Sequence, residues 1–224
     1  VLFRSVYPFK MMAGPFINYS YTIVDEENGK AVLIDPAWER NKIVEFLQIN
    51  GLDLEAILLT HSHYDHVNLV NDLTYIYQCN VYISKIESEF FGYRSPNLNL
   101  LNDLDIITVG NIHILAILTP GHTVGSMCYL TNHTLFTGDT IFNEGCGMCF
   151  GQGADPKSMF QTIQRLKSEI PDSVMVYAGH CFSREVGELF GFLKQNNVYF
   201  LIENEKEFID FRMRSGQKHL FSFN

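Results

Sequence analysis

The sequence predicts a layered α/β protein in which two mixed β-sheets are packed between helices. Two observations lead to this prediction. Strand-like runs open the chain, and strands and helical patterns then alternate twice along the rest of it. No internal repeat or low-complexity linker interrupts the 224 residues, a length that fits one large domain or two small ones with a substantial core.

The first expected element is a β-hairpin near the start of the chain. Residues 17–24 and 31–34 have strand-like composition and flank Asn28 and Gly29, a pair that accepts the positive φ angles of a tight turn. Pro36 then ends the second strand, because proline has no backbone N–H for a strand ladder.

The remaining elements are predicted from apolar spacing, from capping residues and from length. The expected helices cover residues 39–50, 65–77, 85–91, 156–170, 183–195 and 203–213. The expected strands cover residues 56–59, 81–84, 105–118 (two strands, broken at Gly110-Asn111), 127–130, 134–137 and 174–178. This order of strands and helices is typical of two sheets with helices on their outer faces.

The charge balance excludes one large class of partners. The chain has 16 Lys and Arg against 25 Asp and Glu, a net charge of -9, whereas nucleic-acid binders need basic side chains to neutralise phosphates. No apolar run approaches the length of a membrane span, and the first residues lack a basic region followed by an apolar segment. Five cysteines, an odd count, favour a reducing compartment. We therefore expect a cytoplasmic protein that binds neither nucleic acid nor membrane.

A dense cluster of metal-ligand residues follows the expected strand at residues 56–59. Residues 60–66 read Thr-His-Ser-His-Tyr-Asp-His. In an extended segment His61, His63 and Asp65 project to one side, and His66, at the start of a helix, turns toward an adjacent point. One short loop can therefore supply two metal positions, for which zinc, iron and manganese are suitable. For this motif alone, a solvated loop is the alternative.

Three more residues strengthen the prediction of a metal site. His122, Asp139 and His180 each stand beside a glycine and directly after an expected strand. Loops at the ends of strands gather into binding sites, so these side chains are expected to meet the residues of the first motif. Any one of them alone is more typical of a cap or a turn, but four strand ends agree.

Together these motifs resemble those of the metallo-β-lactamase superfamily, an αββα sandwich with metal between the sheet edges. The spacing is most similar to the glyoxalase II branch, including Gly145-Cys146-Gly147, and the match extends from about Asn18 to His180. The whole sequence is also similar to the zinc-dependent hydrolases of bacillaene-type polyketide biosynthesis clusters, which act as thioesterases on acyl carrier proteins.

The resemblance implies a site for two zinc ions, with iron or manganese as alternatives. It implies that one metal is held by His61, His63 and His122. It implies that the second is held by Asp65, His66 and His180, and that Asp139 bridges the two.

The chemistry expected of such a site is thioester hydrolysis by a hydroxide that bridges the metals. Metal binding lowers the pKa of water from 15.7 to about 7, and a thiolate with a parent pKa of about 8.5 leaves with little protonation. Asp65 and Asp139 are expected to orient the attacking oxygen, which makes them the catalytic residues of this prediction. A serine in a Gly-x-Ser-x-Gly turn is absent from the sequence.

Two positions depart from the glyoxalase II pattern. That branch has a lysine and a tyrosine that contact glutathione, where this chain has Met148 and Phe150. Losing the cation removes a charge-assisted hydrogen bond of about 1.5–3 kcal/mol. The expected substrate is therefore an acyl group on the phosphopantetheine arm of an acyl carrier protein. Hydroxyacylglutathione hydrolysis remains an alternative.

The domain prediction assigns residues 1–196 to a catalytic domain and residues 197–224 to a short helical extension packed on it. The last 14 residues contain Arg212, Arg214 and Lys218 and no Asp or Glu. These three cations are a candidate docking surface for an acidic acyl carrier protein, with a solvated tail as the alternative.

Other functions and roles stay open at this point. An iron-dependent sulfur dioxygenase, a lactonase, a β-lactamase and a catalytically silent metal-stabilised binding protein share parts of the pattern. Asp35 has two alternative roles, as a cap at the end of its strand or as a support for a ligand histidine.

Overall fold

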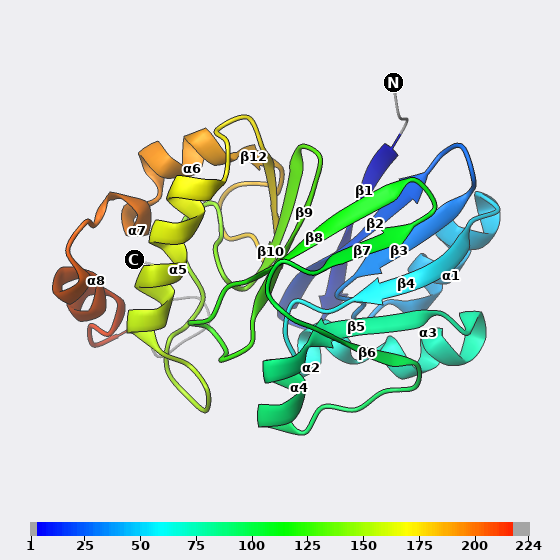
Figure 1. Cartoon of the computed structure of the whole chain (residues 1–224), viewed down its shortest axis with the longest axis horizontal. Helices are drawn as coiled ribbons and strands as arrows, with labels where there is room; N and C mark the ends of the chain where they lie inside the picture. The colour runs from blue at the N-terminus through cyan, green and yellow to red at the C-terminus, as the bar shows by residue number, and fades with distance from the viewer. Residues whose placement is uncertain (1–3, 217–224) are drawn as a thin grey trace.

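The computed structural model describes residues 4–216. It consists of two six-stranded sheets that face each other, with helices on the outer side of each sheet (Figure 1). Each sheet combines parallel and antiparallel pairs; β3, β4, β5 and β6 are joined in parallel in one sheet, and β10 and β11 in the other. The predicted fold class, two mixed sheets between helices, is confirmed.

The first sheet has the spatial order β1-β2-β3-β4-β5-β6. Its strands are β1 (Arg4–Ala13), β2 (Phe16–Asp25), β3 (Lys30–Ile34), β4 (Asp53–Leu58), β5 (Asn80–Ser84) and β6 (Leu98–Leu101). The second sheet has the order β12-β11-β10-β9-β8-β7. Its strands are β7 (Ile106–Val109), β8 (Ile112–Leu118), β9 (Met127–Thr131), β10 (Thr134–Gly138), β11 (Met175–Ala178) and β12 (Glu188–Leu189).

The helices fall into two groups along the chain. They are α1 (Arg40–Ile49), α2 (Tyr64–Val67), α3 (Val70–Tyr77), α4 (Lys85–Phe91), α5 (Pro156–Glu169), α6 (Phe190–Asn196), α7 (Val198–Leu201) and α8 (Glu205–Arg212). Figure 1 shows the first four beside the first sheet and the last four beside the second. Within residues 4–216, none of these helices combines the length and apolarity needed to cross a membrane.

The core between the sheets is built around aromatic side chains. Phe136 of β10 is fully buried, and its ring centroid lies 5.3 Å from that of Tyr21 and 5.8 Å from that of Tyr177. Tyr21 belongs to the first sheet and Tyr177 to the second, so Phe136 is packed at the contact between the two layers.

Truncation of this aromatic contact should lower stability strongly. We expect Phe136→Ala to lower the free energy of unfolding by about 3–5 kcal/mol, because it leaves a cavity that rigid sheets on both sides cannot fill. Urea unfolding measures the change, and Ile49→Ala, at an 83% exposed position, should stay within about 0.5 kcal/mol of the parent protein. Similar losses for both variants would contradict the assigned core.

Besides the two-residue β12, which lies inside the helix expected at residues 183–195, two strands were absent from the sequence prediction, β1 and β6. β1 contains Pro8, which removes a ladder donor, and β1 lies at the sheet edge, where a missing N–H is tolerated. β6 is four residues long and also forms a sheet edge. Neither strand has the long apolar alternation by which buried strands are recognised.

Two predicted helices were wrong in extent. The helix expected at residues 65–77 is divided into α2 and α3, because the N–H of Leu69 donates to the carbonyl of Pro36 at 3.3 Å rather than to its own helix. The helix expected at residues 183–195 begins only at Phe190. Before it, the Glu144 carboxylate accepts hydrogen bonds from the N–H groups of Ser183 and Arg184 and so holds that stretch as a loop.

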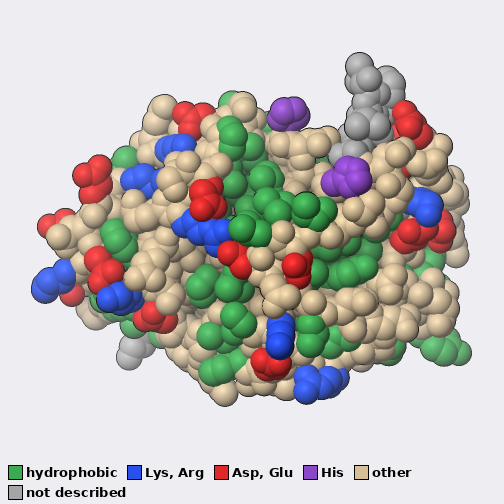
Figure 2. Space-filling view, in the orientation of Figure 1, with side chains coloured by type: hydrophobic (Ala, Val, Ile, Leu, Met, Phe, Trp, Pro, Cys, Tyr) green, Lys and Arg blue, Asp and Glu red, His purple; other side chains and the backbone are tan. Residues whose placement is uncertain are grey.

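The prediction that Arg212 helps to dock a carrier protein is wrong. Arg212 is only 4% exposed, and its Nε donates to the carbonyl of Gly147 at 2.9 Å, because the inner face of α8 turns this side chain into the fold. Arg214 stacks on Phe211 at 3.8 Å, and Lys218 lies outside the described residues. Figure 2 shows Lys and Arg side chains scattered among Asp and Glu on the visible face, without a continuous basic patch.

Candidate metal centre

The seven candidate ligands converge from separate loops at the ends of strands. Residues 61–66 follow β4, His122 follows β8, Asp139 follows β10 and His180 follows β11. The structure therefore brings the candidate ligands together at the ends of these strands, as the sequence predicted.

Three histidines form the first group. The ligand-type nitrogens of His61, His63 and His122 all lie within 4.8 Å of one another. Nδ1 of His63 is 3.0 Å from Nε2 of His122. The three rings face one another nearly edge to face, with centroids 4.6–4.9 Å apart. Three imidazole nitrogens around one point are a donor set suited to zinc.

Asp65, His66 and His180 form the second group, again with donor atoms within 4.8 Å of one another. Asp139 lies between the two groups. Its Oδ1 is 3.3 Å from Nε2 of His66 and 3.4 Å from Nε2 of His180, whereas its Oδ2 is 3.6 Å from Nε2 of His122. One carboxylate thus faces both groups, each oxygen toward a different one.

Buried polar atoms without partners test whether a metal fits here. Nε2 of His61, Nε2 of His66 and Oδ1 of Asp139 are buried and have no hydrogen bond. Leaving one such atom unpaired costs about 1–3 kcal/mol. His61 belongs to the first group, His66 to the second, and Asp139 lies between them. A cation in each group would satisfy all three atoms, so the residues present fit a metal centre.

The opposite ring nitrogens explain how the histidines are aimed. Nδ1 of His122 donates to the carbonyl of Met148 at 2.9 Å, and Nδ1 of His180 donates to the carbonyl of Ile17 at 2.7 Å. With Nδ1 engaged in this way, Nε2 remains free to face the centre of the site.

Asp35 supports two further histidines. Its Oδ2 lies 2.9 Å from Nδ1 of His66 and accepts the hydroxyl hydrogen of Thr60 at 2.6 Å. Since the Thr60 hydroxyl donates to Asp35, its oxygen accepts from Nδ1 of His61 at 3.0 Å. Asp35 has a φ of +48°, a rare conformation for a non-glycine residue that is stabilised here by these buried contacts. Of its two alternative roles, support of a histidine is the one that these contacts favour.

Electrostatics differ between the two groups. Burial, reinforced by neighbouring imidazoles, holds the pKa of His61 well below its usual value and lowers that of His122 to about 4. Burial acts in the same direction on His180, but the Asp139 and Asp65 carboxylates together outweigh it and raise the pKa to about 10. His61 and His122 are therefore neutral at pH 7 and offer lone pairs, while His180 would exchange its proton for a metal that binds.

Close backbone approach at Gly179 allows the second group to form. A Cβ at this position would lie 2.6 Å from Oδ1 of Asp139 and 2.7 Å from Cε1 of His66. Any side chain would therefore displace both groups, which accounts for a glycine directly before His180.

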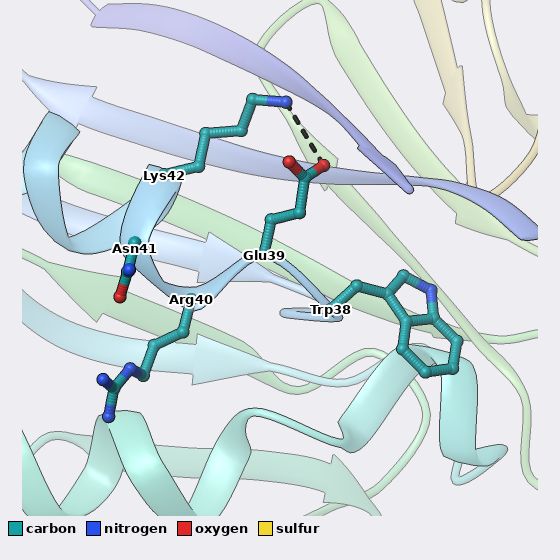
Figure 3. Close-up of a pocket in the computed structure, with 5 residues that line it drawn as sticks. All are labelled: Trp38, Glu39, Arg40, Asn41 and Lys42. Atoms are coloured by element: carbon teal, nitrogen blue, oxygen red, sulfur yellow. Dashed lines mark hydrogen bonds and ion pairs between the residues drawn. The ribbon is translucent and has the colours of Figure 1, made fainter. Parts of the chain in front are cut away.

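A surface pocket lies two hydrogen bonds from the candidate centre. It is lined by Trp38, Glu39, Arg40, Asn41 and Lys42, and Figure 3 shows the Glu39–Lys42 ion pair among them. Nε1 of Trp38 donates to Oδ1 of Asn18 at 2.8 Å, and Nδ2 of Asn18 donates to Oδ2 of Asp65 at 3.1 Å. Asn18 thereby fixes the orientation of the Asp65 carboxylate.

Comparison with known proteins places this arrangement in a family. A family model described as the metallo-beta-lactamase superfamily matches residues 13–180. The chain belongs to the metallo-β-lactamase superfamily. The resemblance predicted from the motifs is therefore confirmed.

Relatives within this superfamily differ in their names. The chain is 48% identical over 206 residues to the probable polyketide biosynthesis zinc-dependent hydrolase BaeB of Bacillus velezensis, and the match covers 92% of each protein. It is 29% identical to a probable hydroxyacylglutathione hydrolase of Schizosaccharomyces pombe, over 97% of this chain and 86% of that one. Among solved structures, a metallo-β-lactamase from Staphylococcus aureus superposes with a TM-score of 0.84 at 27% identity, covering 96% of this chain and 68% of that one.

Some contacts of the centre were missed by sequence reasoning. Asn18 stands 47 positions before Asp65, which it contacts, and Glu87 stands 25 positions after Ser62, with which it forms hydrogen bonds. No local pattern connects residues so far apart, and neither one stands in a motif of metal ligands. Asn18 is the second residue of the strand expected at residues 17–24, and nothing in that pattern marks it.

Proposed function

We propose that this superfamily member is a metal-dependent hydrolase of acyl thioesters and that it binds two zinc ions. The proposed ligands are His61, His63 and His122 for one ion, with Asp65, His66 and His180 for the other and Asp139 between them. The observation that carries the proposal is that three buried ligand atoms, one in each group and one on the carboxylate between them, lack a hydrogen-bond partner. The name of the Bacillus velezensis relative supports zinc and hydrolysis.

Bound divalent metal supplies positive charge that polarises a carbonyl and lowers the pKa of water to about 7. The residues of the chain contribute orientation. Asp65 and Asp139 are acceptors only when ionised, so each can accept a hydrogen bond from an attacking water and aim its lone pair. Asn18 keeps Asp65 in one orientation through its 3.1 Å hydrogen bond. The partners of the Nδ1 atoms keep the histidine rings in place while charge develops on the substrate.

A thioester suits this site because its leaving group departs without a proton donor. A thiol has a parent pKa of about 8.5, so the thiolate departs near neutral pH without a general acid. The carbonyl–sulfur bond breaks, and its electron pair leaves with sulfur. A carboxylate and a thiol are the products. None of the seven proposed ligands therefore has to donate a proton to the leaving group.

For the acyl carrier we propose the phosphopantetheine arm of an acyl carrier protein in polyketide biosynthesis. The name of the Bacillus velezensis relative supports polyketide biosynthesis as the setting. Met148 and Phe150 also support it, because neither one offers a charge to the carboxylates of glutathione. Hydroxyacylglutathione hydrolysis is the second candidate function, favoured by the name of the Schizosaccharomyces pombe relative.

Mass spectrometry of loaded carrier proteins tests the substrate. We expect incubation with the protein to remove the acyl mass while the phosphopantetheine arm stays attached, because hydrolysis breaks only the thioester. The control is the same carrier with an amide-linked acyl group, which should stay intact. Cleavage confined to glutathione thioesters would contradict the carrier proposal and leave the hydrolase proposal in place.

We also propose that residues 1–196 form the catalytic domain and residues 197–224 a short extension packed on it. Contact between Phe208 of α8 and Phe160 of α5, with ring centroids 5.4 Å apart, supports this division.

A cytoplasmic location is proposed as well. All five cysteines lie within the described residues and none forms a disulfide, as is usual in a reducing compartment.

A further inference from the structure

We propose that Glu87, a residue of α4 outside the proposed ligand set, positions the three-histidine group. The inference rests on the proposed metal binding and adds a residue that orders one half of the centre. Glu87 is fully buried. A buried carboxylate is costly unless it is hydrogen-bonded on both oxygens. The hydrogen bonds of Glu87 therefore indicate which parts of the chain it positions.

Glu87 accepts four hydrogen bonds from two loops. Oε1 accepts from the N–H of Ser62 at 2.9 Å and from its hydroxyl at 2.8 Å. Oε2 accepts from the hydroxyl of Thr123 at 2.8 Å and from the N–H of Gly125 at 3.1 Å. Each oxygen therefore binds a different segment of the chain.

These two segments are the ones that carry the three histidines. Ser62 stands between His61 and His63, and Thr123 directly follows His122. The Glu87 carboxylate thus joins the loop after β4 to the loop after β8 at the residues adjacent to the ligands. With Glu87 in place, the two loops cannot move apart without breaking hydrogen bonds to a charged group, each worth about 1.5–3 kcal/mol.

The geometry requires a carboxylate rather than an amide. An ionised carboxylate only accepts, so it can serve two backbone N–H groups and two hydroxyls at once. A glutamine has one accepting oxygen, and its NH2 group would face either the N–H of Ser62 or the N–H of Gly125. One of the two loops would then lose its backbone hydrogen bond, although its hydroxyl could accept from the amide.

The surrounding structure holds Glu87 in place. Ser84 caps α4, with its side-chain oxygen accepting from the N–H of Glu87, which sets the start of the helix beside the two loops. A Cβ on Gly125 would collide with the backbone N of Glu87, so only glycine lets the loop after β8 approach α4 this closely. Ser84 therefore fixes Glu87 within α4, and Gly125 brings the loop after β8 against the Glu87 backbone.

The second group depends on other residues. His66 is held by Asp35, Asp65 by Asn18 and His180 by the carbonyl of Ile17. The four hydrogen bonds that Glu87 accepts include none from these residues. Loss of the Glu87 carboxylate should consequently weaken the three-histidine group and leave the second group intact.

Metal affinity, measured one group at a time, tests the inference. Zn²⁺ is titrated against a chromophoric chelator in two backgrounds, His180→Ala, which leaves the three-histidine group, and His122→Ala, which leaves the second group. Glu87→Gln should weaken Zn²⁺ binding about 10–100-fold in the first background, the usual range for a residue that orients ligands, and leave it unchanged in the second. Thr123→Val, which removes one of the four donors, should cause a smaller loss in the first background only.

The control is Asp25→Asn, because Asp25 is also a buried carboxylate with several hydrogen bonds but lies at the end of β2. It should lower stability without changing affinity in either background. Equal weakening of both groups by Glu87→Gln would overturn the inference, as would unchanged affinity in both. If the parent protein took up no Zn²⁺, the proposed function itself would fail. If it bound Zn²⁺ and Glu87→Gln gave either of these results, only the role of Glu87 would be contradicted.

Discussion

Removal of metal with a chelator should abolish hydrolysis of an acyl thioester, and returning Zn²⁺ should restore it. We expect a loss of about 10³-fold or more, since the metal supplies several kcal/mol of transition-state stabilisation and each 1.36 kcal/mol is a factor of ten in rate. Nε2 of His61 and Nε2 of His66 have no other hydrogen bond that could replace the cation. Thiol release from a soluble thioester measures the rate.

Circular dichroism of the metal-free protein is the control, because activity lost through unfolding would say nothing about chemistry. Separate return of Zn²⁺, Fe²⁺ and Mn²⁺ identifies the metals that support hydrolysis. Full activity in protein shown by elemental analysis to hold no metal would contradict the proposed mechanism. Oxygen uptake with a persulfide after return of iron would instead favour the sulfur dioxygenase alternative.

The sequence predicted those features in which neighbouring residues act together. His61, His63, Asp65 and His66 lie within one loop, so their alternation and the following helix start were enough to indicate two metal positions. The same holds for the turn at Asn28, where two adjacent residues specify a hairpin. Features of this kind can be predicted because all the residues that determine them lie in one short stretch of sequence.

Features that depend on distant residues could not be predicted in this way. Glu87 is 36 positions from Thr123, and Arg212 is 65 positions from Gly147, with which it forms a hydrogen bond. As a sequence feature Arg212 is one of several cations near the end of the chain, which is typical of a solvated surface. Only the packing of α8 shows that its guanidinium is buried and bound to the loop beside the metal centre.

Replacement of the carboxylate between the two groups should have the largest effect of any single substitution. We expect Asp139→Asn to lower kcat/KM for a thioester by about 10²–10³-fold, the range typical of losing one preorganised charged group in an active site. The amide keeps the size of the side chain but removes the negative charge that faces His66, His122 and His180. Asp53→Asn, at an exposed position, should leave the rate unchanged.

A second measurement separates loss of this charge from misfolding. Although burial disfavours its charged form, the pKa of His180 is raised to about 10 in the metal-free protein, with the Asp139 carboxylate as the largest favourable influence. In metal-free Asp139→Asn this pKa should fall, because burial then acts with less opposition. NMR titration of the histidine ring protons reports the change without any metal or substrate. An unchanged His180 pKa together with full activity would show that Asp139 does not link the two groups, and the centre would then have to work as two independent sites.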